Sequence, residues 1–171
     1  MADTLAVNLK ASVDWLFKET LDLSSVADVS SLVYQAPLAD GTAADLADKI
    51  WHDQMASIAA AATTALDLTA LTSTIFGSSV TINFAKVKAI LIVNLATVAG
   101  EKLQIDTTVA NGFTSITGGA AGKIEIGPDS ACLLCNKKDG WATSGANKVL
   151  GIKNVGAAAQ TPKIVIVGTS A

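Results

Sequence analysis

Apolar and polar side chains alternate with a period of two over the first part of the chain, which predicts a β-strand. A helix would place Asn8 and Ser12 on the same stripe as Leu5 and Leu9. The thirteen residues from Leu5 to Phe17 exceed the usual strand of about 5–6 residues. We therefore expect either two strand pairs separated by a bend or an extended arm that reaches a neighbouring copy. The apolar set is Leu5, Val7, Leu9, Ala11, Val13, Trp15 and Phe17.

The next stretch carries weaker patterns. Residues 23–48 are mixed and rich in turn residues, including Pro37 and Asp40-Gly41, and they predict a connection with one short strand around Ser31–Gln35. Residues 43–62 fit a helical stripe and also fit strand alternation, so the residues alone leave both alternatives open. The helical stripe would run through Ala47, Ile50, Trp51, Met55 and Ile58.

Strand signals dominate the remainder of the chain. Residues 84–95 are apolar on both faces, which predicts a strand at the centre of a sandwich or beneath another subunit. The turn at Thr97–Gly100 predicts that residues 101–106 return beside this strand as an antiparallel hairpin. Further short strands are expected at 123–126, 131–136, 148–153 and 163–167.

This succession of short strands and turns predicts an all-β fold, an antiparallel β-sandwich of jelly-roll type with an extended N-terminal segment. Residues 1–45 would form the arm and its connection, with intersubunit contacts, and residues 46–171 the sandwich domain.

Composition narrows the possible functions. The chain has 12 Lys, no Arg and a net charge of −3, which is a poor basis for binding phosphate backbones, so we expect no nucleic-acid partner. With one His, one Tyr and two Cys there is little material for acid–base or metal chemistry. We expect no enzyme, no cofactor and no metal.

Half of the residues are hydrophobic, which raises the question of a membrane. The longest uncharged run, Leu68–Ala85, has the length of a membrane span but contains seven Ser and Thr residues. The N-terminus, Met1-Ala2-Asp3, lacks the basic start of an export signal. We expect no membrane partner, and apolar surface that is hidden in a core or against partner subunits.

Two motifs invite a chemical reading. Cys132 and Cys135 have the spacing of a zinc or redox pair, but the sequence offers no second pair and a strand would point the two thiols to opposite faces, which favours a structural role. The segment Gly118–Lys123 resembles a phosphate loop, but three residues separate its outer glycines where the motif needs four, and Ile124 follows the Lys. A hairpin loop fits better.

Two further features are weaker. His52-Asp53 could orient an imidazole, yet neighbours on a strand face opposite ways, which favours a surface or interface His. Among Trp15, Trp51 and Trp141, the last follows a turn at Asp139-Gly140 and is the candidate for a glycan contact. Packing in the core or at a subunit interface is the favoured alternative for all three.

Several segments together resemble small virion structural proteins of tailed bacteriophages, of the capsid-decoration, cement or fibre type. In that family the region Ile50–Leu68 forms two strands, which favours strands over a helix there. A departure is Gln54-Met55, where similar sequences tend to carry a basic residue. The segments that carry the resemblance are Asp40–Asp45, Ile50–Gln54, Ala59–Leu68, Ile82–Ile90, Ile126–Pro128, Asp139–Ala142 and Ile164–Thr169.

The resemblance implies a homotrimer in the virion that decorates the capsid and bridges major capsid subunits. The alternatives are a tail or head fibre, spike or adhesion component, or a carbohydrate-binding module that uses Trp141. A shell component needs apolar strand surfaces for its neighbours and no chemistry. The expected contacts to other copies are Leu5, Val7, Leu9, Val13, Trp15 and Phe17.

Overall fold

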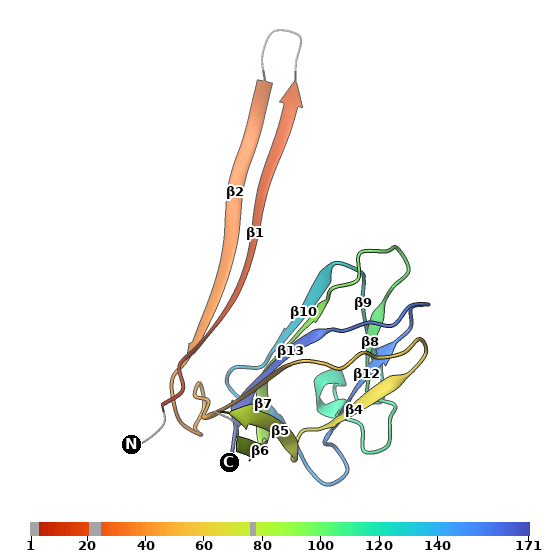
Figure 1. The fold of residues 1–171 in the computed structure, drawn as a ribbon. Helices are drawn as coiled ribbons and strands as arrows, with labels where there is room; N and C mark the ends of the chain where they lie inside the picture. The colour runs from red at the N-terminus through yellow and green to blue at the C-terminus, as the bar shows by residue number, and fades with distance from the viewer. Residues whose placement is uncertain (1–3, 21–24, 76–77) are drawn as a thin grey trace.

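The computed structural model describes residues 4–20, 25–75 and 78–171. Its described part is almost entirely β-structure in antiparallel sheets, which confirms the predicted all-β sandwich class. Figure 1 shows two parts, a long two-stranded hairpin and a body made of packed sheets. The segment Met1–Asp3, on which the expectation about an export signal rests, lies outside the described residues.

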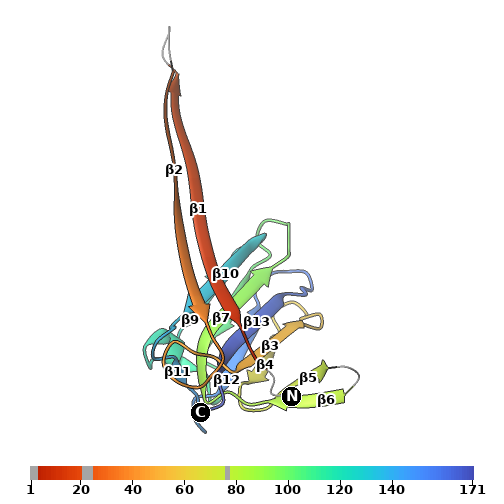
Figure 2. The same ribbon diagram turned by 90° about the vertical axis from the view of Figure 1, so that its left-hand side faces the viewer.

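The hairpin consists of β1 (Val7–Thr20) and β2 (Ser25–Leu38), each of 14 residues. Their register is continuous, from Val7 opposite Leu38 to Thr20 opposite Ser25. At 3.3 Å per residue each strand is about 45 Å long. Figures 1 and 2 show the distal part of the hairpin clear of both sheets.

This hairpin decides between two alternatives and corrects one prediction. The first segment is a single extended strand with no bend between two strand pairs, and whether it reaches a neighbouring copy stays a prediction. Residues 25–38 form one strand in place of the predicted connection with a short strand at 31–35. Apolar residues stand on both faces of β2, so its own alternation is weak. Backbone pairing with β1 makes it a strand, and Pro37 is tolerated because β2 lies at the edge of a two-stranded sheet.

The first sheet of the body has the strand order β10 (Ser130–Cys135), β7 (Lys86–Asn94), β13 (Lys163–Thr169), β3 (Lys49–Gln54). A short strand, β11 (Trp141–Ala142), also pairs with β7. The sheet therefore places the strongest apolar strand of the sequence, β7, between β10 and β13. This is the central position that its two apolar faces predicted.

The second sheet has the order β4 (Thr63–Asp67), β12 (Val149–Asn154), β8 (Leu103–Asp106), β9 (Lys123–Ile126). The small hairpin of β5 (Leu71–Ile75) and β6 (Ser78–Ile82) follows β4, and a 3₁₀ turn, η1 (Thr114–Thr117), precedes β9. The inner faces of both sheets share one core. Its fully buried members include Phe84, Ile90, Ile92, Leu103, Phe113, Leu150, Ile152 and Ile166.

The predicted hairpin between residues 84–95 and 101–106 is wrong, because β7 and β8 belong to different sheets. The reason lies at the end of β7, where the buried Asn94 side chain donates to the carbonyls of Glu101 and Gly127, each at 2.9 Å. The turn therefore leads the chain across the core into the second sheet.

Residues 43–62 form no helix, because β3 occupies residues 49–54 and the rest of this range has no helical residue; β4 follows directly at Thr63. Trp51 is buried in the core and its indole N–H donates to the Thr72 carbonyl at 2.9 Å. Among the described residues, no helix is long and apolar enough to cross a membrane.

Candidate interaction surface

One face of the hairpin is built mainly from apolar residues. Because paired residues of an antiparallel ladder share a face, the alternating positions of β1 from Val7 to Phe17 share a face with their partners on β2, Leu38 to Asp28. We call this the apolar face. Its apolar members are Val7, Leu9, Ala11, Val13, Trp15 and Phe17 from β1 and Leu32, Tyr34, Ala36 and Leu38 from β2, and its polar members are Ser30 and Asp28 at the distal end.

The distal half of the apolar face is exposed in the isolated chain. The exposed fractions are Val13 63%, Trp15 42%, Phe17 68%, Leu32 67% and Tyr34 54%. An exposed carboxylate also lies there, because the Trp15 indole N–H donates to Asp28 Oδ2 at 3.3 Å.

The opposite face of the hairpin mixes polar and apolar residues. It carries the charged residues Lys10, Asp14 and Lys18, and it also carries the exposed apolar residues Leu16 and Val29. The two faces therefore differ in continuity, because three charged side chains are spread along the opposite face, whereas the positions from Val7 to Phe17 and their partners include one, Asp28 at the distal end.

The proximal end of the same apolar face packs against the body. Leu9, Ala36 and Leu38 are buried in a small cluster with Ala89 of β7 and Val167 of β13. A hydrogen bond from the Leu5 amide to Asp40 Oδ1, at 3.1 Å, ties the start of the chain to the link that follows β2. The hairpin is thus held at its root by apolar contact with the outer face of the first sheet.

That outer face is itself arranged in apolar rows across the strands. The row under the hairpin root is Cys135, Ala89, Val167 and Ile50, and the next row is Leu133, Leu91, Val165 and His52. The hairpin covers part of the first row. The apolar members of the second row are only partly buried.

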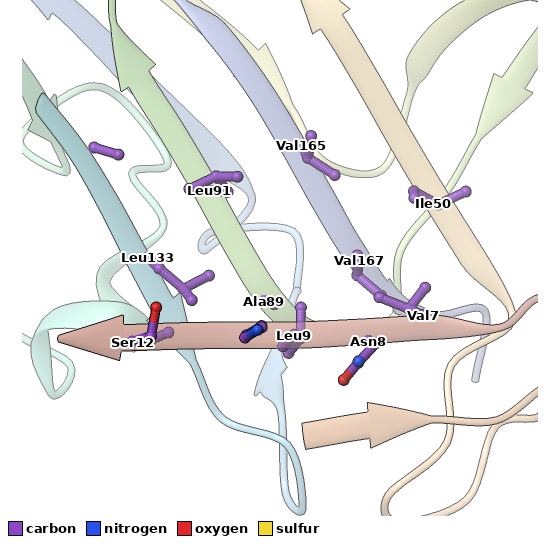
Figure 3. A pocket seen from close by; sticks show the side chains of 13 residues that line it. Val7, Asn8, Leu9, Ser12, Ile50, Ala89, Leu91, Leu133, Val165 and Val167 are labelled. Atoms are coloured by element: carbon purple, nitrogen blue, oxygen red, sulfur yellow. The ribbon is translucent and has the colours of Figure 1, made fainter. Parts of the chain in front are cut away.

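A groove separates β1 from this sheet where the hairpin rises away from the body. Its volume is about 590 Å³. Figure 3 shows β1 crossing the strands of the sheet, with Leu91, Leu133 and Val165 beside the crossing. Lys10 is the one charged residue among those that line the groove in the described part of the chain.

The six residues expected to contact other copies fall into two groups. Leu5, Val7 and Leu9 lie at the root, where they pack against their own body, whereas Val13, Trp15 and Phe17 lie on the exposed distal half. That all six serve contacts between copies stays a prediction.

Sequence reasoning missed the residues that complete this surface. Leu32 and Tyr34 stand on the apolar face through pairing with β1, and Leu133 and Val165 extend the outer face of the sheet. The only signal in β2 was the spacing of two from Leu32 to Leu38.

The two cysteines face opposite sides of β10. Cys132 packs against the main core, and Cys135 packs against the cluster at the hairpin root. Burial raises the pKa of both thiols, and for Cys135 a backbone hydrogen bond and the Lys137 charge oppose that effect. Both sulfurs are therefore held in the protonated form, which is a weak nucleophile and a weak metal ligand.

The other chemical motifs lie apart from one another. His52 and Asp53 are exposed on β3, and the glycine-rich segment 118–123 connects η1 to strand β9, whereas a phosphate loop would open a helix. In the described residues no group of three or more His, Cys, Asp or Glu side chains could hold a metal ion.

Trp141, the candidate for a glycan contact, begins β11 beside Val87 and packs in part against the main core. Of the three tryptophans, Trp51 is 4% exposed and Trp15 is 42% exposed. The most exposed indole of the three is therefore on the hairpin.

No protein-family profile, curated protein or solved structure matches this chain. The resemblance to phage virion proteins therefore rests on the residues quoted for it.

Proposed function

We propose that this chain is a non-enzymatic structural protein of a bacteriophage particle, a homotrimer that decorates the capsid and cements it by bridging major capsid subunits. Its place of action is the virion, after synthesis in the host cytoplasm. The hairpin is the element through which it contacts its neighbours.

The observation that carries this proposal is the exposed distal half of the apolar face. A two-stranded hairpin on its own is only marginally stable in water. From the exposed fractions, and with about 150–250 Å² for each large aromatic side chain, the patch exposes on the order of 500 Å². Patches above a few hundred Å² mark interaction sites on soluble proteins, and a stable interface takes about 800 Å² from each partner.

A role in a symmetric shell fits this geometry. Each copy presents the same projecting hairpin, so ring symmetry repeats a modest contact several times. The resemblance in residues supports the choice of a phage capsid, and the low charge without Arg suits protein neighbours better than nucleic acid.

The first experiment compares the full chain with a shortened hairpin. Removing residues 13–20 and 25–32 keeps residues 21–24 of the native sequence and joins them to Ser12 and Val33, which are directly paired. Eight pairs are removed, an even number, so each remaining side chain keeps its face. We expect the full chain to be a trimer by light scattering, and the shortened chain to be a folded monomer that no longer attaches to particles.

The second experiment counts copies in purified particles of the phage that encodes the chain. Quantitative mass spectrometry against the major capsid protein should give hundreds of copies per particle. About a dozen copies or fewer would favour the alternative of a fibre, spike or adhesion component at the tail or a vertex. Absence from particles would reject both virion roles.

A further inference from the structure

We propose that the apolar face of the hairpin of one copy docks on the outer face of the first sheet of the next copy. The acceptor is the row formed by Leu133, Leu91 and Val165, together with Ile50, which also lines the groove. This inference rests on the proposed self-association and names the two surfaces that meet.

The same two surfaces already meet within one chain. At the root, Leu9, Ala36 and Leu38 of the apolar face bury Ala89 and Val167 of the outer sheet face. Both surfaces then continue past this contact, the hairpin toward Phe17 and the sheet toward its second row. The contact between copies would extend an interface whose chemistry the chain already uses.

The surfaces also match in composition. The acceptor row is apolar across β10, β7 and β13 and ends in His52 on β3. The donor face presents Val13, Trp15 and Leu32, and the carboxylate of Asp28 lies farther along it, opposite Phe17. Apolar rows meet with no charged side chain to desolvate at the centre, which is how the core of a stable interface is built.

The geometry favours a second copy over contact with the chain's own hairpin. The hairpin rises away from its own body, so its distal half does not cover its own second row, and a groove of about 590 Å³, lined by residues 7–12 of β1, remains between the proximal hairpin and the sheet. That volume accommodates several large side chains from a neighbour. Donor and acceptor are different surfaces, so the contact is heterologous and closes into a ring when the rotation between copies is right.

The test uses two half-defective chains. The acceptor chain has the shortened hairpin without residues 13–20 and 25–32 and keeps its sheet. The donor chain keeps its hairpin and carries Ile50→Lys and Leu133→Lys on β3 and β10, the strands at the two ends of the sheet order. We expect each chain alone to be monomeric and an equimolar mixture to form a 1:1 complex by light scattering.

A matched pair of donor variants localises the contact to one face of the hairpin. Val13→Thr/Phe17→Thr/Leu32→Thr alters the apolar face, and Leu16→Thr/Val29→Thr alters the opposite face; all five residues are more than 60% exposed. In the mixture, the first variant should weaken binding about tenfold or more, and the second by less than about twofold. Equal weakening by both variants would overturn the assignment of the face.

The remaining outcomes separate this inference from the proposed function. If the donor chain alone assembles as well as the full chain, hairpins pack against one another, so the sheet contact is wrong while self-association stands. If the full chain associates but the mixture does not, the sheet contact is also wrong. If the full chain is monomeric at every concentration, the proposed self-association itself fails. Circular dichroism checks that each chain is folded. If the donor chain with Ile50→Lys and Leu133→Lys does not fold, a donor chain with Leu133→Thr alone takes its place.

Discussion

The hairpin and the body are built from similar strands but treat their apolar side chains in opposite ways. In the body, β7 places Ile90 and Ile92 in a core where both are completely buried. In the hairpin, β1 presents Val13 and Phe17 to solvent at 63% and 68% exposure. Apolar strand residues thus form a buried core in one region and a solvent-exposed apolar surface in the other.

The difference follows from the number of layers. Each body sheet has a second sheet against its inner face, so its apolar row is buried within the chain. The hairpin has a neighbouring layer only at its root, over Ala89 and Val167. Stability should therefore depend on the body, and association on the distal hairpin.

The largest effect should come from truncating the body core. Phe84 is completely buried, so Phe84→Ala should lower the free energy of unfolding by about 3–5 kcal/mol. Urea denaturation of the shortened-hairpin chain, monitored by circular dichroism, measures this loss without a contribution from association. A loss below about 1 kcal/mol would contradict the assignment of this side chain to the core.

A smaller effect is expected from replacing both cysteines, one of which packs against the body core and the other against the hairpin root. Cys132 contacts the main core and Cys135 the hairpin root, so the double replacement by Ala should cost about 1–3 kcal/mol in packing. Metal analysis by mass spectrometry should give the same result for both proteins. Loss of a bound metal on replacement would overturn the structural role.

A pH-dependent effect is expected from Glu101, which stabilises the loop before β13. Its carboxylate accepts hydrogen bonds from the amides of Ala157 and Ala158 and from the Gln160 side chain, at 3.1 Å in each case. The Ala158 amide is the largest influence, and with Gln160 and Ala157 it outweighs burial and holds the pKa of Glu101 below its ordinary value of 4.5.

Because this pKa is lower in the folded state, the contribution is complete above the unfolded pKa and is lost as pH falls through the folded pKa. Glu101→Gln should therefore lower Tm at pH 7 and make the decline of Tm between pH 5 and pH 3 shallower. Thermal melts of both proteins at pH 7, pH 5 and pH 3 measure this. A decline as steep as that of the unaltered chain would contradict the prediction.

The smallest effect on stability should come from the distal hairpin. At a concentration where the chain is monomeric, Phe17→Ala should change the free energy of unfolding by less than about 0.5 kcal/mol, because its side chain is exposed. Leu16 on the opposite face is 65% exposed, so Leu16→Ala should change the free energy of unfolding in urea just as little. A large loss for Phe17 alone would mean that the hairpin contributes to the monomer's own core.

Much of the body could be predicted from local pattern. The strand at Lys123–Ile126 was predicted with its observed bounds, and the strands at β7, β10, β12 and β13 within a few residues, because each alternates or is apolar on both faces between clear turns. That residues 84–95 and 101–106 belong to different sheets could not be predicted, since a turn sequence does not reveal that Asn94 directs the chain across the core.

The candidate surface was only half predictable. Alternation from Val7 to Phe17 identified one strand of the apolar face, whereas Leu32 and Tyr34 acquired their place from the register of the hairpin. Leu133 and Val165 lie 32 residues apart in the sequence and become neighbours of Leu91 only through the sheet order.

The sequence by itself determined that this protein is made of strands and that β1 has one mainly apolar side. Its hydrophobic content of 50% also determined that much apolar surface has to be covered. These properties depend on side chains two residues apart, which any extended chain displays. Tertiary structure alone decided which apolar rows are covered. Coverage depends on which strands lie side by side and which layer lies above them, and those contacts join residues that are distant in the sequence.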